Sequence, residues 1–491
     1  MSNPEFSVVI VGGGFSGTML AVQLLRRAPN VSVAMVDTGA VPGRGLAYGT
    51  NYRCHLLNVP AGNMSALPEE PNHFLSWART NYNPLAQDTS FLPRGIYGRY
   101  VGSLLDEATA SNRAANFRRL QGEASSFMRE PSHVKVQLKD GRKLTARTVV
   151  LASGNFPPGN LNIPGLPERS GHYFPSAWAA GALQDIPRNG SVLLIGSGLT
   201  GLDLAVALES EGFAGHIHIL SRHGLMPQPH RQTCRWPQFW NEQSPRTTRG
   251  LLRLVREQVR AAWEVGVDWR AVIDTLRPVT QEIWQSLPLG ERRRFLRHLR
   301  SYWEVHRHRI APDIGGLIAK LIHKGQVELH GGRLTHYREY ADHVKVGWRD
   351  RKTAGQRVLR LDRVINCTGP ETNCRRIDNP LIISLLAHGL VRPDPLFLGL
   401  DVDGNGALID GKGTPSNALY AIGPVRKGDL WETTAVPEIR VQASQLAEHL
   451  ASIVETQTRN ATSAVSETSV GDFTAVAVAE NANRGKPALR I

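Results

Sequence analysis

Two glycine-rich turns, far apart in the chain, are the parts of the sequence with the clearest chemical meaning. One follows the apolar run SVVIV and the other follows SVLLI, and each precedes a segment whose apolar residues have helical spacing. Both turns have the spacing G-x-G-x-x-G, with Gly12, Gly14, Gly17, Gly196, Gly198 and Gly201. The first glycine of such a turn allows a tight bend, the second lets a pyrophosphate approach the backbone, and the third lets helix pack on strand. The pattern predicts two dinucleotide sites, in which Phe15, Ser16 and Thr200 also take part.

The strand after each turn indicates which nucleotide is bound. Asp37 lies about 20 residues after Gly17, where a carboxylate accepts hydrogen bonds from a ribose. Ser221 lies about 20 residues after Gly201, and Arg222 follows it. A hydroxyl and a cation suit the 2′-phosphate of NADPH better than the bare ribose of NADH. The alternative is that Arg222 is an ordinary solvated surface charge.

The duplication extends beyond the turns. Segments 133–154 and 343–369 both read as alternating strands that end in an apolar strand and a glycine, Gly154 or Gly369. We expect each closing strand to return beside its glycine turn. Two dinucleotides on one chain favour hydride transfer from nicotinamide to flavin. The predicted fold is therefore α/β, with two Rossmann-like dinucleotide-binding domains, for FAD and NADPH, and a helical insertion in the second.

The predicted domains are discontinuous. The FAD-binding domain comprises 1–165 and 366–455, the NADPH-binding domain comprises 166–225 and 316–365, the helical insertion is 226–315, and a flexible tail is 456–491. The insertion has arginines between apolar residues at helical spacing, and we expect most of its tryptophans in the core. The tail is rich in Thr, Ser, Ala and Asn.

Composition excludes several classes of protein. The chain of 491 residues has a net charge of +14, but no nucleic-acid-binding motif accompanies that charge, so phosphate-bearing cofactors or an anionic substrate explain it better. Four scattered cysteines without a Cys-x-x-Cys pair argue against a disulfide reductase. No signal peptide or membrane-length apolar run is evident. We expect a cytoplasmic protein without nucleic-acid or membrane partners.

Several motifs resemble a known family: the turns GGGFSG and GSGLTG, the strand ends ASG and CTG, and the segment LYAIGPVRKGDLWETTAVPEIRVQASQLAEHL. The family comprises bacterial FAD/NAD(P)-binding proteins, similar to class B flavin monooxygenases and distantly related to flavin-dependent N-hydroxylases. The resemblance extends from residue 7 to about residue 452 and includes 55–78 and 91–105. It implies that FAD lies at the first turn and NADPH at the second. It further implies flavin contacts from Arg44, Gly45, Asn58, Met64, Gly423 and Pro424. Many two-dinucleotide flavoproteins have an aspartate where this chain has Pro424, so backbone contacts must replace it.

The candidate catalytic residues are Glu432 and Asn58. Glu432 could orient substrate or handle a proton near the flavin, or it could anchor the helix that follows, and both alternatives stay open. Candidate substrate-binding cations, which suit an anionic group, are His306, Arg307 and Arg309, and, with less support, Arg94, Arg99, Arg231 and Arg235. No metal is predicted, because no acid or cysteine completes a ligand set with His306 and His308.

The leading functional hypothesis is an NADPH-dependent flavin monooxygenase that resembles the N-hydroxylases and uses molecular oxygen. Its substrate would be a small molecule with an amine, either with or without an anionic group. A flavin reductase or dehydrogenase that passes electrons to a quinone or a protein acceptor is one alternative. A non-enzymatic NADPH-sensing interaction protein is another. An exposed tryptophan-bearing helix would favour a homo-oligomer.

Overall fold

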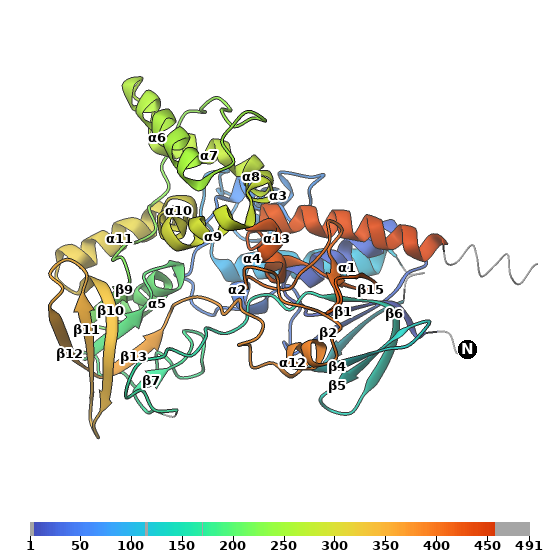
Figure 1. Cartoon of the computed structure of the whole chain (residues 1–491), viewed down its shortest axis with the longest axis horizontal. Helices are drawn as coiled ribbons and strands as arrows, with labels where there is room; N and C mark the ends of the chain where they lie inside the picture. The colour runs from blue at the N-terminus through green and yellow to red at the C-terminus, as the bar shows by residue number, and fades with distance from the viewer. Residues whose placement is uncertain (1–3, 113–115, 169, 457–491) are drawn as a thin grey trace, which may run out of the picture.

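The computed structural model describes residues 4–112, 116–168 and 170–456, which build two separate β-sheets (Figure 1). The first sheet lies at the right of the figure and the second at the left, and the helices of the insertion stand above them in this view. The predicted flexible tail, 456–491, lies outside the described residues apart from its first position. Among the described residues, no helix combines the length and apolarity needed to cross a membrane.

The first sheet has a parallel centre in the order β15-β6-β1-β2-β3. Those strands are β1 (Phe6–Val11), β2 (Ser32–Asp37), β3 (Asn116–Gln121), β6 (Lys143–Leu151) and β15 (Pro415–Ala421). Antiparallel neighbours extend it, namely β4 (Ala124–Arg129), β5 (Val134–Leu138) and β14 (Ala407–Ile409). The central strands are almost entirely buried, as near-continuous apolar runs require in a sheet covered on both faces.

The second sheet repeats this plan with the parallel order β10-β9-β8-β13-β7. Those strands are β7 (Tyr173–Phe174), β8 (Ser191–Ile195), β9 (His216–Ser221), β10 (Val327–Glu339) and β13 (Arg363–Asn366). The antiparallel strands β11 (Val344–Asp350) and β12 (Gln356–Leu361) continue from β10. In the two sheets β6 pairs with β1 and β13 pairs with β8, so each closing strand returns beside its glycine turn, as the sequence predicts.

Helices cover the first sheet on both faces. The helix after the first turn packs on one face together with α4 (Arg94–Ser111) and the helix 436–456. On the other face, α12 (Pro380–Ala387) packs with β4 and β5. The helical segments outside the insertion are α1 (Phe15–Arg27), α2 (Gly45–Tyr48), α3 (His73–Asn81), α4 (Arg94–Ser111), α5 (Leu199–Ser210), α12 (Pro380–Ala387) and α13 (Lys427–Leu430), with the 3₁₀ turns η1 (Ala61–Asn63) and η3 (Gly423–Arg426).

The insertion is helical, as predicted. Its segments are α6 (Thr248–Glu264), α7 (Trp269–Leu276), η2 (Arg277–Val279), α8 (Thr280–Ser286), α9 (Leu289–His298), α10 (Arg300–Arg307) and α11 (Pro312–His323). Helix α11 crosses the predicted boundary at residue 315, and its Ile318 and Leu321 share a core cluster with Leu202 of α5. Structurally α11 therefore belongs with the second sheet. Of the insertion's tryptophans, Trp240 and Trp284 are buried and Trp263 is 79% exposed.

Candidate functional site

The two glycine turns have the same backbone geometry. Gly12 and Gly196 have φ values of +114° and +119°, in the range that favours glycine. A Cβ at Gly12 would collide with the carbonyl of Ala152, and one at Gly196 with the carbonyl of Cys367. In the same way, Gly17 and Gly201 pack directly against the carbonyls of Gly12 and Gly196. The first and third glycines of each motif are thus required by close contact between the turn, the closing strand and the following helix.

Both turns present an uncapped helix N-terminus. The N-cap residues of α1 and α5 are Gly14 and Gly198, and neither helix receives a side-chain cap. The backbone N–H groups of the first turn of each helix are consequently available to an external acceptor, and the helix dipole favours an anion there. A Cβ added at Gly198 would meet nothing within 4 Å, so space for a ligand adjoins the second turn. Both helix ends fit a pyrophosphate.

Unfilled space also adjoins the glycine at the end of each closing strand. Gly154 and Gly369 have φ values of +66° and +87°, and an added Cβ would meet nothing within 4 Å at either position. The hydroxyl of Ser153 is buried, and no hydrogen-bond partner for it lies in the described part of the chain. A buried polar atom without a partner beside a glycine cradle fits a polar ligand such as a dinucleotide.

The ribose positions differ between the domains. Asp37 ends β2 close to the first turn, where a Cβ on Gly13 would lie 2.8 Å from its Oδ2. Ser221 ends β9, and its Oγ accepts a hydrogen bond from Gly224 N at 3.0 Å. Arg222 is exposed and lines the cavity described next. One domain therefore presents a carboxylate, and the other presents a hydroxyl with a cation.

A second cation, which the sequence did not suggest, joins Arg222. Arg333 reaches the same wall of the cavity from β10, a strand distant in sequence. The pKa of His223 is lowered by burial and then by the charges of Arg351, Arg222 and Arg333, so all three guanidinium groups lie near His223. This concentration of positive charge fits a phosphate.

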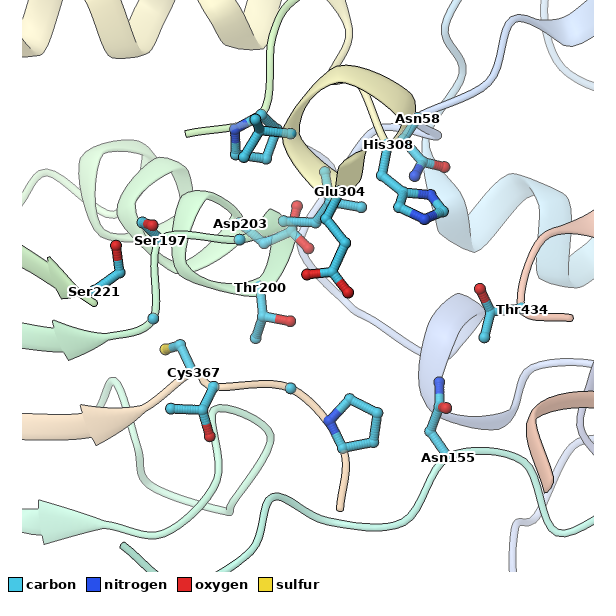
Figure 2. A pocket seen from close by; sticks show the side chains of 18 of the residues that line it. Asn58, Asn155, Ser197, Thr200, Asp203, Ser221, Glu304, His308, Cys367 and Thr434 are labelled. Carbon is cyan, nitrogen blue, oxygen red and sulfur yellow. The ribbon is translucent and has the colours of Figure 1, made fainter. Parts of the chain in front are cut away.

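A cavity of about 830 Å³ lies where the two domains and the insertion meet. Figure 2 shows Ser197, Thr200 and Ser221 on the side of the second turn, and Asn58, Asn155 and Thr434 on the side of the first domain. Helix α10 forms its roof with Arg300 and Glu304, and His308 follows directly after the helix. The site thus joins segments from all parts of the chain.

The residues that the resemblance assigns to the flavin surround the first turn and one end of this cavity. Asn58, Met64 and Pro424 line the cavity. Gly45 lies against Gly14, and the Nε atom of Arg44 is buried with no partner within the described residues. Gly423 has a φ of +81° and packs against Ser16, while Phe15 faces Tyr48 and Tyr97 in the core. Apart from the Phe15 side chain, these positions fit a cofactor at the first turn.

The charged groups of the cavity roof were absent from the predicted site. Glu304 accepts a hydrogen bond from Arg300 Nε at 2.8 Å, and in Figure 2 its carboxylate points into the cavity. Burial, with the nearby charge of Arg300, lowers the pKa of Lys427 to about 8. Burial, with Arg307 nearby, lowers the pKa of His308 to about 3, so this imidazole is neutral at pH 7. Around Glu304, the cavity lining therefore brings together a carboxylate, two basic groups and a neutral imidazole.

The structure does not bring the predicted substrate cations together. Arg94 lines the cavity, but its guanidinium is paired with Asp203 of α5. Arg99, Arg231 and Arg235 are exposed and lie outside the cavity lining. His306 packs edge-on against Trp269, with ring centroids 4.7 Å apart, and also lies outside the lining.

Arg307 and Arg309 are buried in ion pairs: Arg309 pairs with Asp274 inside the insertion, whereas Arg307 joins the insertion to Glu432 outside it. Arg309 makes a two-point contact with Asp274 at 2.7 and 3.0 Å. Arg307 donates to Glu432 Oε2 at 2.5 Å, and Trp303 donates to Glu432 Oε1 at 3.2 Å. Both oxygens of Glu432 therefore face the insertion, and Glu432 does not line the cavity. This geometry favours the anchoring alternative over a catalytic role for Glu432.

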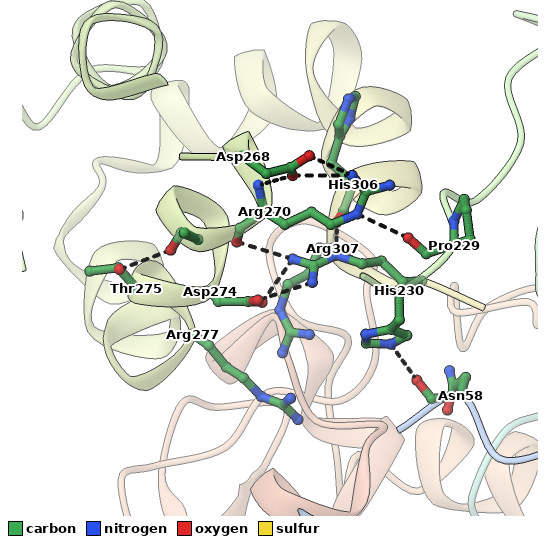
Figure 3. A network of polar contacts seen from close by, with 12 residues as sticks. Asn58, Pro229, His230, Asp268, Arg270, Asp274, Thr275, Arg277, His306 and Arg307 are labelled. Atoms are coloured by element: carbon green, nitrogen blue, oxygen red, sulfur yellow. Dashed lines mark hydrogen bonds and ion pairs between the residues drawn. The ribbon is translucent and has the colours of Figure 1, made fainter. Parts of the chain in front are cut away.

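Asn58 is held from the insertion side. His230 Nε2 lies 3.0 Å from the backbone oxygen of Asn58, as Figure 3 shows, and burial lowers the pKa of His230 to about 4. The neutral imidazole can donate this hydrogen bond. His230 therefore fixes the backbone of Asn58, whose side chain faces the cavity.

Comparison with known proteins concerns the first glycine turn and the fold. Residues 9–156 match the model of a family described as FAD-NAD(P)-binding. Comparison with curated proteins gives no significant sequence match.

Solved structures share the fold along almost the whole chain. The cadaverine monooxygenase of desferrioxamine biosynthesis from Erwinia amylovora, solved with FAD, has a TM-score of 0.63 at 14% identity and covers 91% of this chain and 95% of its own. Ornithine N-hydroxylase from Kutzneria sp. 744, solved with reduced FAD, NADP⁺ and L-ornithine, has a TM-score of 0.60 at 13% identity. The match covers 91% of this chain and 99% of the hydroxylase. Thioredoxin reductase from Lactococcus lactis has a TM-score of 0.53 at 13% identity, and the match covers 92% of this chain and 100% of the reductase.

These matches confirm the predicted fold class and the resemblance to N-hydroxylases at the level of fold. Residues 9–156 match an FAD-NAD(P)-binding family model, and the chain as a whole has the two-domain fold of the compared flavoproteins.

Proposed function

We propose that this protein is an NADPH-dependent flavin monooxygenase that hydroxylates the amine of a small substrate carrying a carboxylate. FAD is held by the first glycine turn and NADPH by the second. The chemistry that these cofactors supply when bound is reduction of the flavin by NADPH and reaction with molecular oxygen. The observation that carries the proposal is the single cavity that runs from Ser221 and Arg222 to Asn58 and Met64 under the roof of α10.

The chain's own residues would bind and orient the reactants. Arg222 and Arg333 hold the 2′-phosphate, and the uncapped N-terminus of α5 holds the pyrophosphate. Helix α10 and the segment 434–436 line the cavity and would shield a bound substrate from water. Exclusion of water matters in this reaction class because it prevents wasteful side reactions.

Charges on the roof favour an amine with a carboxylate. The carboxylate of Glu304 can accept hydrogen bonds from a substrate ammonium, and Arg300 and Lys427 can bind a substrate carboxylate. Both signs of charge line one cavity, and this suits an amino acid better than a simple diamine. The neutral imidazole of His308 can accept or donate a hydrogen bond beside these charged groups.

A disulfide reductase, whose fold is similar, is disfavoured by the cysteines. All four are free, and they occur at positions 54, 234, 367 and 374 without a Cys-x-x-Cys pair. Burial raises the pKa of Cys374 to about 11 and also raises the pKa of Cys367, so neither thiol is activated.

The test is aerobic turnover by the purified flavin-loaded protein with NADPH and matched pairs of substrates. Each pair is an amino acid and the amine left after its decarboxylation, such as L-lysine and cadaverine. We expect one amino acid to increase NADPH oxidation and to yield a hydroxylamine, and its decarboxylated partner to be used at least tenfold less efficiently. NADPH oxidation that requires an added quinone and gives no hydroxylated product would instead identify a reductase. Tight NADPH binding without any turnover would identify a nucleotide-sensing protein.

A further inference from the structure

Three side chains on the second sheet, outside the cavity lining, form a cluster of metal-ligand type. His218 belongs to β9, and Glu328 and His330 belong to β10. The parallel register places Glu328 opposite His218, and His330 is two residues further along β10. Since alternate residues of a strand share a face, all three side chains lie on the same face of the sheet. In the described part of the chain, this is the group whose ligand atoms all lie within 4.8 Å of one another.

The spacing of the three ligand atoms matches a metal centre. His218 Nδ1 is 3.1 Å from His330 Nε2, and each of these nitrogens is 3.7 Å from Glu328 Oε2. The point equidistant from the three atoms lies about 2.0 Å from each, and zinc bonds to imidazole nitrogen and carboxylate oxygen are about 2.0–2.2 Å. A metal ion can therefore enter without movement of the backbone.

We propose that His218, Glu328 and His330 bind one Zn²⁺ ion, with water as the fourth ligand. Two imidazoles and a carboxylate are a donor set that Zn²⁺ favours. The imidazoles are held in place, because the side chain of His218 is only 9% exposed and the ring of His330 packs on Trp348 with centroids 5.0 Å apart. The side chain of Glu328 is 54% exposed, which leaves the solvent side open for the water.

The location suggests what the ion does. His218 lies three positions before Ser221 on β9, and His330 lies three positions before Arg333 on β10. A shared ion would fasten the two strands just before the residues that face the nucleotide phosphate. Its role is structural, because the cluster does not line the cavity. This inference does not depend on the proposed monooxygenase reaction.

The experiment is calorimetric titration of the chelator-treated, full-length protein with ZnCl₂. We expect one ion per chain, and at least tenfold weaker binding for Glu328→Gln, an isosteric change at an exposed carboxylate, and for His330→Gln. The matched control is His216→Gln, an exposed histidine two positions from His218 on β9, which should bind Zn²⁺ like the natural protein. Far-ultraviolet circular dichroism verifies that each variant is folded.

Co²⁺ provides a second measurement, because a tetrahedral site with nitrogen and oxygen ligands gives visible absorption that Glu328→Gln should abolish. Absence of stoichiometric Zn²⁺ binding by the natural protein would overturn the proposal. Equal binding by the natural protein, Glu328→Gln and His330→Gln would overturn it too, since the ion would then lie elsewhere. In either case the cluster would be a histidine pair joined by a hydrogen bond beside a carboxylate.

Discussion

Arg94 at the start of α4 and Asp203 on α5 join the two dinucleotide-binding domains through a two-point ion pair. Their N···O distances are 2.6 and 3.0 Å, and the two side chains are only 15% and 14% exposed. Arg94 Nε also donates to the backbone oxygen of Leu56 at 2.9 Å. A sequence-predicted substrate cation is therefore part of the contact between the domains.

Replacement of Arg94 by alanine should destabilise this contact. The change leaves Asp203 largely buried without its partner, and we expect a loss of roughly 2–3 kcal/mol in the free energy of unfolding, somewhat less than for a fully buried pair. Urea unfolding followed by tryptophan fluorescence measures it. Arg99→Ala, at an exposed position of the same helix, is the control and should change stability by less than about 0.5 kcal/mol. Equal stability of the two variants would contradict the role of Arg94.

Arg222→Ala should remove most of the enzyme's preference for NADPH over NADH. Loss of one charge-assisted contact to the 2′-phosphate costs about 1.5–3 kcal/mol, so kcat/KM for NADPH should fall about 10- to 100-fold while that for NADH changes little. Arg333→Ala should have the same selective effect. Arg338→Ala, at another exposed arginine of β10 that does not line the cavity, is the control. Equal losses with both nucleotides would show that Arg222 does not bind the 2′-phosphate.

Glu304→Gln tests recognition of the substrate amine. The amide keeps the shape of the side chain but removes the negative charge, so KM for the amine should increase about 10- to 100-fold, as expected for one charge-assisted hydrogen bond. NADPH oxidation without substrate should stay unchanged, because Glu304 is assigned to the amine and not to the nucleotide. Glu257→Gln, at an exposed position of α6, is the control. An unchanged KM would exclude contact between Glu304 and the amine.

The pH dependence of substrate binding should report on Lys427. Burial lowers its pKa from 10.5 to about 8, and its ammonium group lies 4.9 Å from the ring centroid of Trp431. Because the lysine loses its charge as pH rises through about 8, KM for a carboxylate-bearing substrate should increase above that pH. Lys427→Arg, whose charge persists, should remove this increase. The same KM profile in both proteins would rule out Lys427 as the titrating group.

The same lowered pKa has a consequence for stability. Between pH 8 and 10.5 the unfolded chain keeps a proton on Lys427 that the folded chain releases, so the lysine's contribution to stability rises with pH in this interval. Below about pH 8 the folded protein carries the full cost of the buried charge. Lys427→Met should remove this dependence, as urea unfolding at several pH values would reveal.

The pairing of Glu432 with Arg307 can be separated from catalysis by a double substitution. Burial raises the pKa of Glu432, and the guanidinium of Arg307 opposes that shift. Glu432→Leu leaves the buried Arg307 with only its longer contact to Glu438, at 3.4 Å, and should cost about 3 kcal/mol, the low end of the range for a broken buried pair. The additional change Arg307→Met should restore most of that stability. Unfolding free energies of the single and double variants test this. Loss of turnover in a double variant of natural stability would return Glu432 to the catalytic candidates.

Much of the protein could be predicted from its sequence, because the information is local. The glycine spacing, the strand before each turn and the residue at the end of the next strand lie within short segments, so the two parallel sheets and the return of each closing strand beside its glycine turn could be predicted. The close contacts at Gly12 and Gly196 supply the physical reason, since only glycine fits them. The helical nature of the insertion was likewise evident from its apolar spacing.

The tertiary structure alone decided which charges meet. Arg94 and Asp203, Arg307 and Glu432, and His218 and His330 lie far apart in sequence, so no spacing rule could pair them. Arginines that looked like substrate ligands became structural because burial requires a charged group to find a partner. Conversely, Glu304, His308 and Lys427 became candidate site residues only because α10 folds over the junction of the two domains. Sequence determined the cofactor-binding frame, and packing between distant segments determined what surrounds the substrate.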